Sequence, residues 1–225
     1  MRVGVDEAGR GCVVGPLFVA AAAFTEEGLE RLREAGVRDS KRLSRRRREE
    51  LEGLIRREAA FLGLRRVDPW VIDSRNINEA EVEAVASLLS ELRGRLEGAE
   101  VEAVTVDLFG REEELRDLIN KAFPGAEARL VHGADALFTE CSAASIIAKV
   151  ERDRFIDWLK RAYGDFGSGY SSDPRTVEWL AAAAASGRLP PWVRRSWRTL
   201  LRCAPSQFVD KRRGRPPPAG LQQYF

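Results

Sequence analysis

The order of its apolar segments is what most constrains this chain. Two short apolar stretches, 1–7 and 16–24, follow each other across a glycine-rich turn, and a third lies at 60–68. Farther along, strand-like segments at 101–109 and 128–135 alternate with helical ones. Three strands in succession, followed by alternating helices and strands, predict an α/β protein with a mixed five-stranded sheet flanked by helices.

Helical spacing of apolar residues marks the segments between and after these strands. In the longest of them Val85, Leu88, Leu89 and Leu92 recur at intervals of three to four residues. The predicted helices cover 44–58, the stretch from Ile77 to Leu96, 111–122, 142–163 and 174–186. The last of these begins a helical C-terminal part.

Basic residues gather near the C-terminal end. The whole chain carries a formal charge of +2, whereas residues 194–215 hold eight Lys or Arg and one acid. Such a stretch indicates a polyanionic partner such as nucleic acid, the alternative being an ordinary solvated helix and tail. Here Arg194, Arg195 and Arg198 are expected to form a basic patch, with Trp192 and Trp197 between them in the core.

Other classes of protein fit the sequence poorly. With 44% hydrophobic and 32% charged residues the chain can build a core and remain in water. No run is long and apolar enough to span a bilayer, and the pattern of a signal peptide is missing. The three cysteines are widely spaced and lack the spacing of a zinc site, which indicates reduced thiols in a cytoplasmic protein.

Two adjacent acids, Asp6 and Glu7, stand at the end of the first apolar run in "GVDEAGRG". Like charges this close repel each other, so the pair costs stability unless a cation compensates. Asp107 and Asp135 also end predicted strands, and ligands gather at the carboxyl ends of parallel strands. Glu7 would point to the opposite face from Asp6 unless the strand ends there and the chain turns.

Carboxylates without a histidine or cysteine partner suit hard cations such as Mg²⁺ or Mn²⁺. A pair of such ions stabilises both the attacking and the leaving oxygen in phosphodiester cleavage. The alternative for each single acid is an ordinary helix cap. The lone histidine, His132, is expected to be structural within a strand, so a metal-activated water is the better candidate nucleophile.

Six motifs spread over nearly the whole chain. They are "DEAGRGCVVGP" (6–16), "DSKRLS" (39–44), "VTVDLF" (104–109), "GAD" (133–135), "SAASIIAKVERD" (142–153) and "GSGYSSDP" (167–174). In content and order these motifs resemble those of type 2 ribonuclease H, in its compact archaeal or bacterial form. The stretch before residue 142 departs from the family pattern and adds Glu140, which we expect at the surface.

This resemblance implies a ribonuclease H-like fold and a divalent-metal-dependent endonuclease. Its substrates would be RNA–DNA hybrids and duplex DNA with embedded ribonucleotides, cut to leave 3′-hydroxyl and 5′-phosphate ends. Asp6, Glu7, Asp107 and Asp135 match the family's four catalytic, metal-binding acids. The resemblance also implies roles in DNA replication and ribonucleotide excision repair.

The resemblance further implies substrate-binding residues. Gly9, Arg10 and Gly11 match the turn that reads the substrate's sugar, since glycines let backbone amides approach a 2′-hydroxyl. Tyr170 matches a tyrosine that packs on the sugar at the RNA–DNA junction. For Lys41 we expect a phosphate contact, and for Lys149 either such a contact or an ordinary surface charge.

The last residues, "GLQQYF", resemble the end of a peptide that docks onto a sliding clamp, through Leu221, Tyr224 and Phe225. The expected glutamine is replaced by Pro218, and a meaningless apolar terminus is the alternative. We therefore predict three parts: a catalytic domain at 1–165, a helical substrate-binding part at 166–208 and a flexible tail at 209–225.

Two alternatives to this enzyme stay open. One is a different nuclease of the same fold, such as a junction resolvase or a type 1 enzyme. The other is a hybrid-binding module without catalysis, which would usually lack one or more of the four acids. The protein is expected to be a monomer.

Overall fold

Residues 1–38 and 42–211 are described by a computed structural model of the chain. The chain divides into two units, each built from three separate segments. The first comprises Met1–Ala8, Phe18–Arg66 and Glu81–Glu151; the second comprises Gly9–Leu17, Val67–Ala80 and Arg152–Phe225. The predicted domain boundaries after residues 165 and 208 stay predictions.

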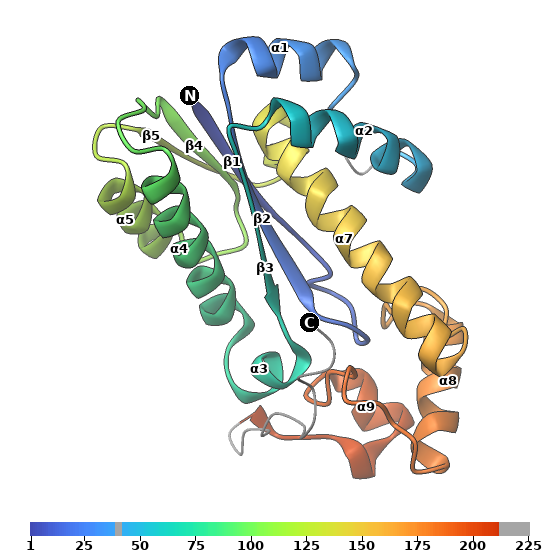
Figure 1. Cartoon of the computed structure of the whole chain (residues 1–225). Helices are drawn as coiled ribbons and strands as arrows, with labels where there is room; N and C mark the ends of the chain where they lie inside the picture. Colours follow the sequence, from blue (N-terminus) through green and yellow to red (C-terminus); the bar gives the residue numbers. More distant parts are fainter. Residues whose placement is uncertain (39–41, 212–225) are drawn as a thin grey trace. The chain divides into compact units, whose positions relative to one another are not determined.

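A five-stranded sheet forms the centre of the first unit (Figure 1). Its strands are β1 (Arg2–Ala8), β2 (Leu17–Phe24), β3 (Phe61–Val67), β4 (Ala103–Asp107) and β5 (Glu127–Val131). They lie in the order β3-β2-β1-β4-β5, with β1 antiparallel to β2 and parallel to β4, and β4 parallel to β5. The predicted mixed five-stranded sheet is confirmed.

Helices cover both faces of this sheet, α4 and α5 on one side and α7 on the other (Figure 1). A methyl group on Gly4 of β1 would come within 2.2 Å of the Glu140 backbone, and one on Gly63 of β3 within 2.7 Å of the Leu88 side chain. Because these two glycines carry no side chain, α7 packs closely against β1 and α4 against β3. The helices of this part are α1 (Glu26–Glu34), α2 (Arg45–Glu58), α4 (Ile77–Arg95), α5 (Glu112–Ala122), α6 (Ala134–Leu137) and α7 (Thr139–Tyr163).

Tryptophan organises the core of the second unit. Trp192 is 1% exposed, and its ring lies 4.9 Å from that of Phe155 and 5.4 Å from that of Trp70, centroid to centroid. Trp197 packs against the same core, so the expected core position of both tryptophans is confirmed. Around this core lie α3 (Pro69–Ser74), α8 (Pro174–Ala185), α9 (Arg198–Cys203) and the 3₁₀ turn Pro205–Gln207.

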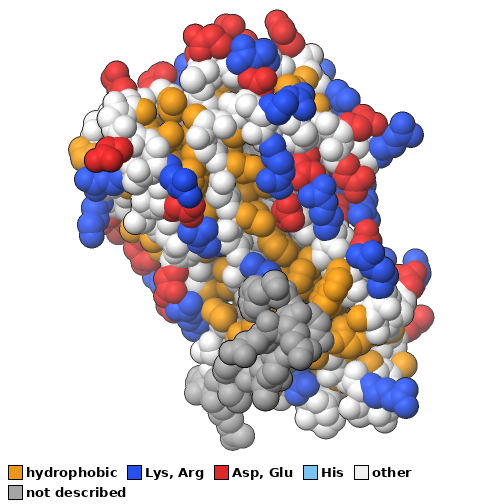
Figure 2. Space-filling view, viewed as in Figure 1, with side chains coloured by type: hydrophobic (Ala, Val, Ile, Leu, Met, Phe, Trp, Pro, Cys, Tyr) orange, Lys and Arg blue, Asp and Glu red, His pale blue; other side chains and the backbone are white. Residues whose placement is uncertain are grey.

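Local signals explain most of the predicted helices. Ser44 caps α2 by accepting a hydrogen bond from the Arg47 amide, and the helix then carries i,i+4 ion pairs such as Arg45–Glu49. Figure 2 shows basic and acidic side chains next to one another over α1 and α2. Gly164, with φ of +80°, follows the last residue of α7. No helix within the described part of the chain is long and apolar enough to cross a bilayer.

Two predictions about secondary structure were wrong in detail. The strand predicted at 128–135 ends at Val131, and His132 lies exposed in the turn that follows rather than within a strand. The sequence analysis did not predict α1 or α3, whose short lengths of 9 and 6 residues offer few turns for a periodic pattern.

Candidate active site

The parallel pairing of β1 with β4 brings two of the predicted acids side by side. Val5 lies opposite Val106 in this pairing, so Asp6 and Asp107 are the next residues in register. Neighbouring strands lie about 4.8 Å apart, so adjacent side chains on one face meet. Asp6 is only 4% exposed, although β1 continues beyond it to Ala8.

Asp135 reaches the same region from a helix rather than from a strand. Gly133, in the left-handed conformation at φ of 71°, starts the short helix α6, and Asp135 lies in its first turn, 1% exposed. Asp107 Oδ1 accepts hydrogen bonds from the backbone amides of Gly133 at 2.6 Å and Ala134 at 3.3 Å. One acid of the cluster thus fixes the turn that carries another.

Glu7 is half-buried, and its backbone amide donates a 2.7 Å hydrogen bond to Asp6 Oδ1. Burial, and then the charge of Glu7, raise the pKa of Asp6 well above its ordinary value. The charge of Asp107 acts in the same direction. The two adjacent acids therefore interact electrostatically even though the strand does not end at Asp6.

Lys149 on α7 supplies positive charge to these acids. Its Nζ lies 3.7 Å from Asp135 Oδ2 and donates a 2.6 Å hydrogen bond to Ser145 Oγ. Both Lys149 and a hydrogen bond from Ser145 lower the pKa of Asp6, against the larger effect of burial. The Lys149 side chain is 21% exposed beside a buried acid, and its predicted phosphate contact stays a prediction.

Cys141, in α7, lies against β1 next to these acids. Burial raises the pKa of its thiol well above the ordinary value, and the charges of Asp6, Asp107 and Asp135 raise it further. The Cys141 thiol donates to the carbonyl of Val5 at 3.3 Å. The structure thus brings together the acids that the sequence spreads over 130 positions.

The donor set fits Mg²⁺ or Mn²⁺ by its chemistry, because all four side chains offer carboxylate oxygens. Among residues 1–38 and 42–211, however, no three His, Cys, Asp or Glu side chains are arranged as a preformed metal cage. Backbone amides hold an oxygen of Asp107, and Lys149 lies against Asp135. Metal binding at this cluster would require side chains to turn toward a common ion.

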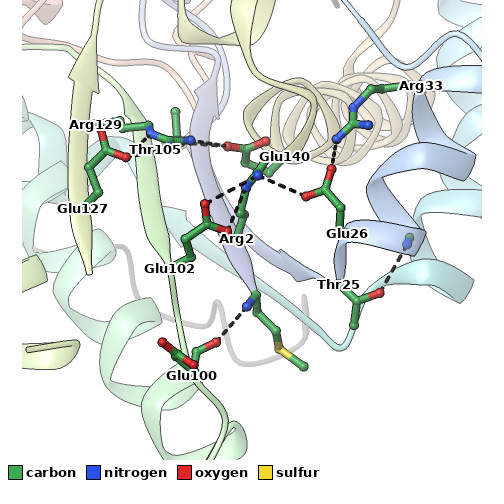
Figure 3. A network of polar contacts seen from close by, with 12 residues as sticks. Arg2, Thr25, Glu26, Arg33, Glu100, Glu102, Thr105, Glu127, Arg129 and Glu140 are labelled. Carbon is green, nitrogen blue, oxygen red and sulfur yellow. Dashed lines mark hydrogen bonds and ion pairs between the residues drawn. The ribbon is translucent and has the colours of Figure 1, made fainter. Parts of the chain in front are cut away.

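Glu140 is a correction to the sequence analysis, which expected a surface acid. It is 3% exposed and accepts a 2.9 Å hydrogen bond from Thr105 Oγ1, with Arg129 Nη1 at 3.9 Å from its Oε1 (Figure 3). Arg129 in turn bonds Glu127, so this buried acid is balanced by a polar network. Glu140 therefore ties the start of α7 to the middle of β4.

In the second unit, the predicted substrate-reading turn is a tight, glycine-dependent loop. Gly9 has φ of +90°, and its carbonyl accepts a 3.1 Å hydrogen bond from the Cys12 amide. A methyl group on Gly9 would approach the Pro16 carbonyl oxygen to 2.9 Å. Gly11 is exposed, and a methyl group there would meet the Tyr170 ring at an ordinary 3.7 Å.

Tyr170 is held beside this turn by Arg152. The Arg152 guanidinium lies 5.0 Å from the centre of the Tyr170 ring, and its Nη2 donates to the phenolic oxygen at 3.1 Å. An isolated β-bridge joins Tyr170 to Cys12. Burial raises the pKa of Tyr170, so the phenol stays protonated at neutral pH. The structure therefore brings Tyr170 and Gly11 together, as the substrate-binding hypothesis requires.

The predicted basic patch is wrong for one of its three arginines. Arg194 is completely buried, and its guanidinium bonds backbone carbonyls of the Gly9–Gly15 loop. The side chain of Arg10, in the predicted substrate-reading turn, donates to Asn78 Oδ1. The predicted sites Lys41, Leu221, Tyr224 and Phe225 lie outside the described residues.

Sequence analysis also missed three residues of the second unit. Arg152 lies within a motif but was given no role, Arg194 was expected in a surface patch, and Asp73 carried no motif at all. Asp73 is fully buried and accepts hydrogen bonds from the amides of Arg195 and Ser196, both at 2.9 Å. Only the partners reveal these roles, and those lie far away in the sequence.

Comparison with known proteins places this arrangement in one structural class. A structure of the ribonuclease H2 from Pyrococcus horikoshii matches with a TM-score of 0.80 at 40% identity, covering 92% of this chain and 98% of that one. A structure of Bst-RNase HIII in complex with Mn²⁺ matches with a TM-score of 0.77 at 21% identity, covering 92% and 70%. At 21% identity, the similarity to Bst-RNase HIII supports the fold and nothing further. The fold is the ribonuclease H-like fold.

The family follows from two closer findings. The sequence model of the family Ribonuclease HII matches residues 3–200. The Ribonuclease HII of Saccharolobus solfataricus is 44% identical over 212 residues, covering 94% of this chain and 97% of that protein. A further solved structure is a PCNA:RNase HII complex from Archaeoglobus fulgidus, with a TM-score of 0.79 at 42% identity, covering 91% and 97%. The chain belongs to the Ribonuclease HII family, and it is a type 2 ribonuclease H.

Proposed function

We propose that this type 2 ribonuclease H is a divalent-metal-dependent endonuclease that cuts both RNA–DNA hybrids and duplex DNA at embedded ribonucleotides. Cleavage leaves 3′-hydroxyl and 5′-phosphate ends. The observation that carries the proposal is the convergence of three acids: Asp6 and Asp107 are neighbours in the β1–β4 register, and Asp107 holds the turn that carries Asp135. Asp6 and Asp135 are nearly inaccessible to solvent. A cluster of like charges this buried is costly unless cations join it.

Asp6, Glu7, Asp107 and Asp135 would hold Mg²⁺ or Mn²⁺. When bound, a pair of such ions activates water and stabilises the charge on the phosphate oxygens. The chain's own residues orient this site: the Gly133 amide fixes Asp107, and Ser145 and Lys149 fix the surroundings of Asp6. Lys149, beside Asp135, would also attract the substrate phosphate.

The turn Gly9-Arg10-Gly11 and Tyr170 would select the sugar. Gly11 is exposed and lies against the Tyr170 ring, so a ribose can rest on the ring and approach the turn's backbone. Backbone amides can then meet the 2′-hydroxyl, the group that distinguishes RNA from DNA.

The direct test is cleavage of a labelled DNA duplex that contains one ribonucleotide, with Mg²⁺ or Mn²⁺, beside an all-DNA duplex. Asp107→Asn removes one acid of the cluster. Asp117→Asn, the same change at an exposed position of α5, is the matched control. We expect a metal-dependent cut at the 5′ side of the ribonucleotide by the parent and by Asp117→Asn only. Tight binding without a cut under any metal would favour the hybrid-binding module instead.

A sliding clamp is the proposed protein partner. The supporting observation is the Archaeoglobus fulgidus neighbour, whose structure is a PCNA:RNase HII complex. In this chain we propose that Leu221, Tyr224 and Phe225 of the tail make the contact. Removal of residues 219–225 should abolish clamp binding in a surface-plasmon assay and leave cleavage of short duplexes unchanged. Equal clamp binding by the shortened chain would assign the contact elsewhere.

A further inference from the structure

Arg194 is the largest charged side chain in the buried interior of the second unit. It is 0% exposed, in a segment whose neighbour Trp192 is the centre of an aromatic core. Burial lowers the pKa of Arg194 to about 10, so the guanidinium keeps its charge at neutral pH. A buried charge is retained only where its surroundings compensate it.

The compensation comes from one loop. Arg194 Nη2 donates to the Gly9 carbonyl at 2.7 Å, Nη1 to the Arg10 carbonyl at 2.8 Å and Nε to the Gly15 carbonyl at 2.9 Å. These acceptors stand at the two ends of the loop that contains the predicted substrate-reading turn. The planar guanidinium fork therefore fixes the loop's width and the direction of three carbonyl groups.

The direction of a carbonyl also decides the direction of an amide. In a trans peptide group the C=O and the N–H lie in one plane and point in opposite directions. Since the carbonyls of Gly9 and Arg10 point toward Arg194, the amides of Arg10 and Gly11 point away from it. These two amides belong to the turn expected to meet the substrate's sugar.

Arg194 is itself held in place by its surroundings. Its guanidinium carbon lies 4.9 Å from the centre of the Trp197 ring, and its backbone amide donates to the Val13 carbonyl at 2.8 Å. Asp73 binds the next two backbone amides, those of Arg195 and Ser196. The guanidinium therefore acts as a rigid template, since neither end of the side chain is free to shift.

We propose that Arg194 is a positioning residue that aims the peptide groups of Gly9-Arg10-Gly11 and thereby sets the preference for a ribonucleotide over a deoxyribonucleotide. This inference rests on the proposed function of the turn. This role differs from one in stability alone. Without the Arg194 guanidinium the amides of Arg10 and Gly11 would still be present but would point in other directions. The ribose-specific part of binding should then fall more than the contacts to the phosphate backbone.

The test compares Arg194→Gln and Arg194→Lys with the parent at a temperature well below all unfolding midpoints. Binding to a duplex with one ribonucleotide and to the same all-DNA duplex is measured in an Asp107→Asn background, which prevents cleavage. We expect the ratio of the two affinities to fall up to about tenfold in Arg194→Gln, the loss that one misaligned hydrogen bond between a backbone amide and the 2′-hydroxyl entails. Arg194→Lys, which keeps the charge but offers its donors from a single nitrogen, should lie between Gln and Arg.

Leu180→Ala is the matched control. Leu180 is 0% exposed in the same core and bonds no part of the turn, so its truncation destabilises the unit through a cavity. We expect Leu180→Ala to lower the unfolding temperature while the affinity ratio stays that of the parent. A similar fall of the ratio in Leu180→Ala would show that any loosening suffices, and would overturn the proposal.

Three further outcomes separate the positioning role from the proposed function. An unchanged ratio in folded Arg194→Gln overturns the positioning role while the parent's cleavage at ribonucleotides leaves the proposed function standing. Failure of both Arg194 variants to fold would assign the residue to stability alone, which also overturns it. If the parent itself cuts no ribonucleotide-containing duplex, it is the proposed function that fails.

Discussion

The acid cluster and the Arg194 loop are two opposite ways of burying charge. Around Asp6 the protein gathers negative charges, and the pKa of this acid is raised by burial and by its neighbours. Around Arg194 the protein buries one positive charge. Three backbone carbonyls accept hydrogen bonds from this guanidinium, at 2.7, 2.8 and 2.9 Å. The first arrangement calls for cations from outside, and the second is complete within the chain.

This difference indicates which region does chemistry and which supports it. A cluster whose charges oppose one another costs stability and persists where a ligand makes use of it. A charge whose hydrogen bonds are satisfied adds rigidity to the backbone around it. Substitutions in the acid cluster should therefore lower activity more than stability. Substitutions in the Arg194 loop should lower stability more than activity.

The largest effect is expected from Asp6→Asn. Activity should fall about 1000-fold, since metal-ion catalysis is worth several kcal/mol. Stability at pH 7 should stay equal or rise. The pKa of Asp6 is raised in the folded state, so its ionised form opposes folding above that pKa, and asparagine resembles the favoured protonated form. Single-turnover rates and unfolding temperatures measure both; a clear loss of stability would contradict the comparison.

In the loop that Arg194 holds, substitutions of two nearby glycines should differ strongly in their effect on stability. Gly9→Ala should destabilise the protein by about 3 kcal/mol, because φ is +90° there and the Pro16 carbonyl oxygen is 2.9 Å from the new methyl. Gly11→Ala meets only an ordinary contact and should leave stability within about 0.5 kcal/mol. It should nevertheless weaken binding of ribonucleotide duplexes. Denaturant unfolding measures the stability of each variant, and duplex titration measures its binding. Equal destabilisation by Gly9→Ala and Gly11→Ala would contradict the role assigned to the Gly9 backbone.

Lys149→Gln tests the cation inside the acid cluster. Removing a charge 3.7 Å from Asp135 should cost about 1–2 kcal/mol of unfolding free energy at pH 7. Added Mg²⁺ should then raise the unfolding temperature more in the variant than in the parent, since the metal replaces the missing charge. The same thermal shift in both proteins would mean that Lys149 and the metal do not act on one cluster.

The smallest effect is expected at Asp165, where charge is fully compensated at the surface. The amide of Gly167, and then the side chains of Lys160 and Arg175, lower its pKa to about 2. A lowered pKa contributes stability that is present above the ordinary aspartate value of about 4 and is lost as the pH falls toward 2. Asp165→Asn should therefore be slightly less stable than the parent at pH 7, with the difference shrinking between pH 4 and 2. A difference that persists at pH 2 would point to another cause.

Much of this architecture was predictable because its signals are local. The strand periodicity around residues 1–7 and 101–109 placed Asp6 and Asp107 in two strands, and parallel pairing then made them neighbours. Only Asp107 ends its strand as predicted, because β1 continues to Ala8. The prediction for Asp135 found the right residue in the wrong element, since the strand stops at Val131 and Gly133 begins a helix. A two-residue shift of this kind depends on hydrogen bonds to Asp107, which the local pattern does not contain.

Glu140 and Arg194 mark the limit of local reasoning. Both are charged residues in charged or polar surroundings of the sequence, and both were expected at the surface. Their burial depends on partners far away along the chain: Thr105 for Glu140, and the carbonyls of Gly9, Arg10 and Gly15 for Arg194. Hydrophobic periodicity reports which face of an element is apolar, and it carries no information about such polar partners.

By itself, then, the sequence determined the mixed sheet, the family and the acids that meet at β1 and β4. Those depend on side-chain alternation, on helix signals and on motifs whose own residues lie within a few positions of one another. Only the tertiary structure decided which charged side chains are buried and which groups form hydrogen bonds with them. The physical reason is that the free energy of a buried charge is set by the groups within hydrogen-bonding distance in space, whatever their separation in the chain.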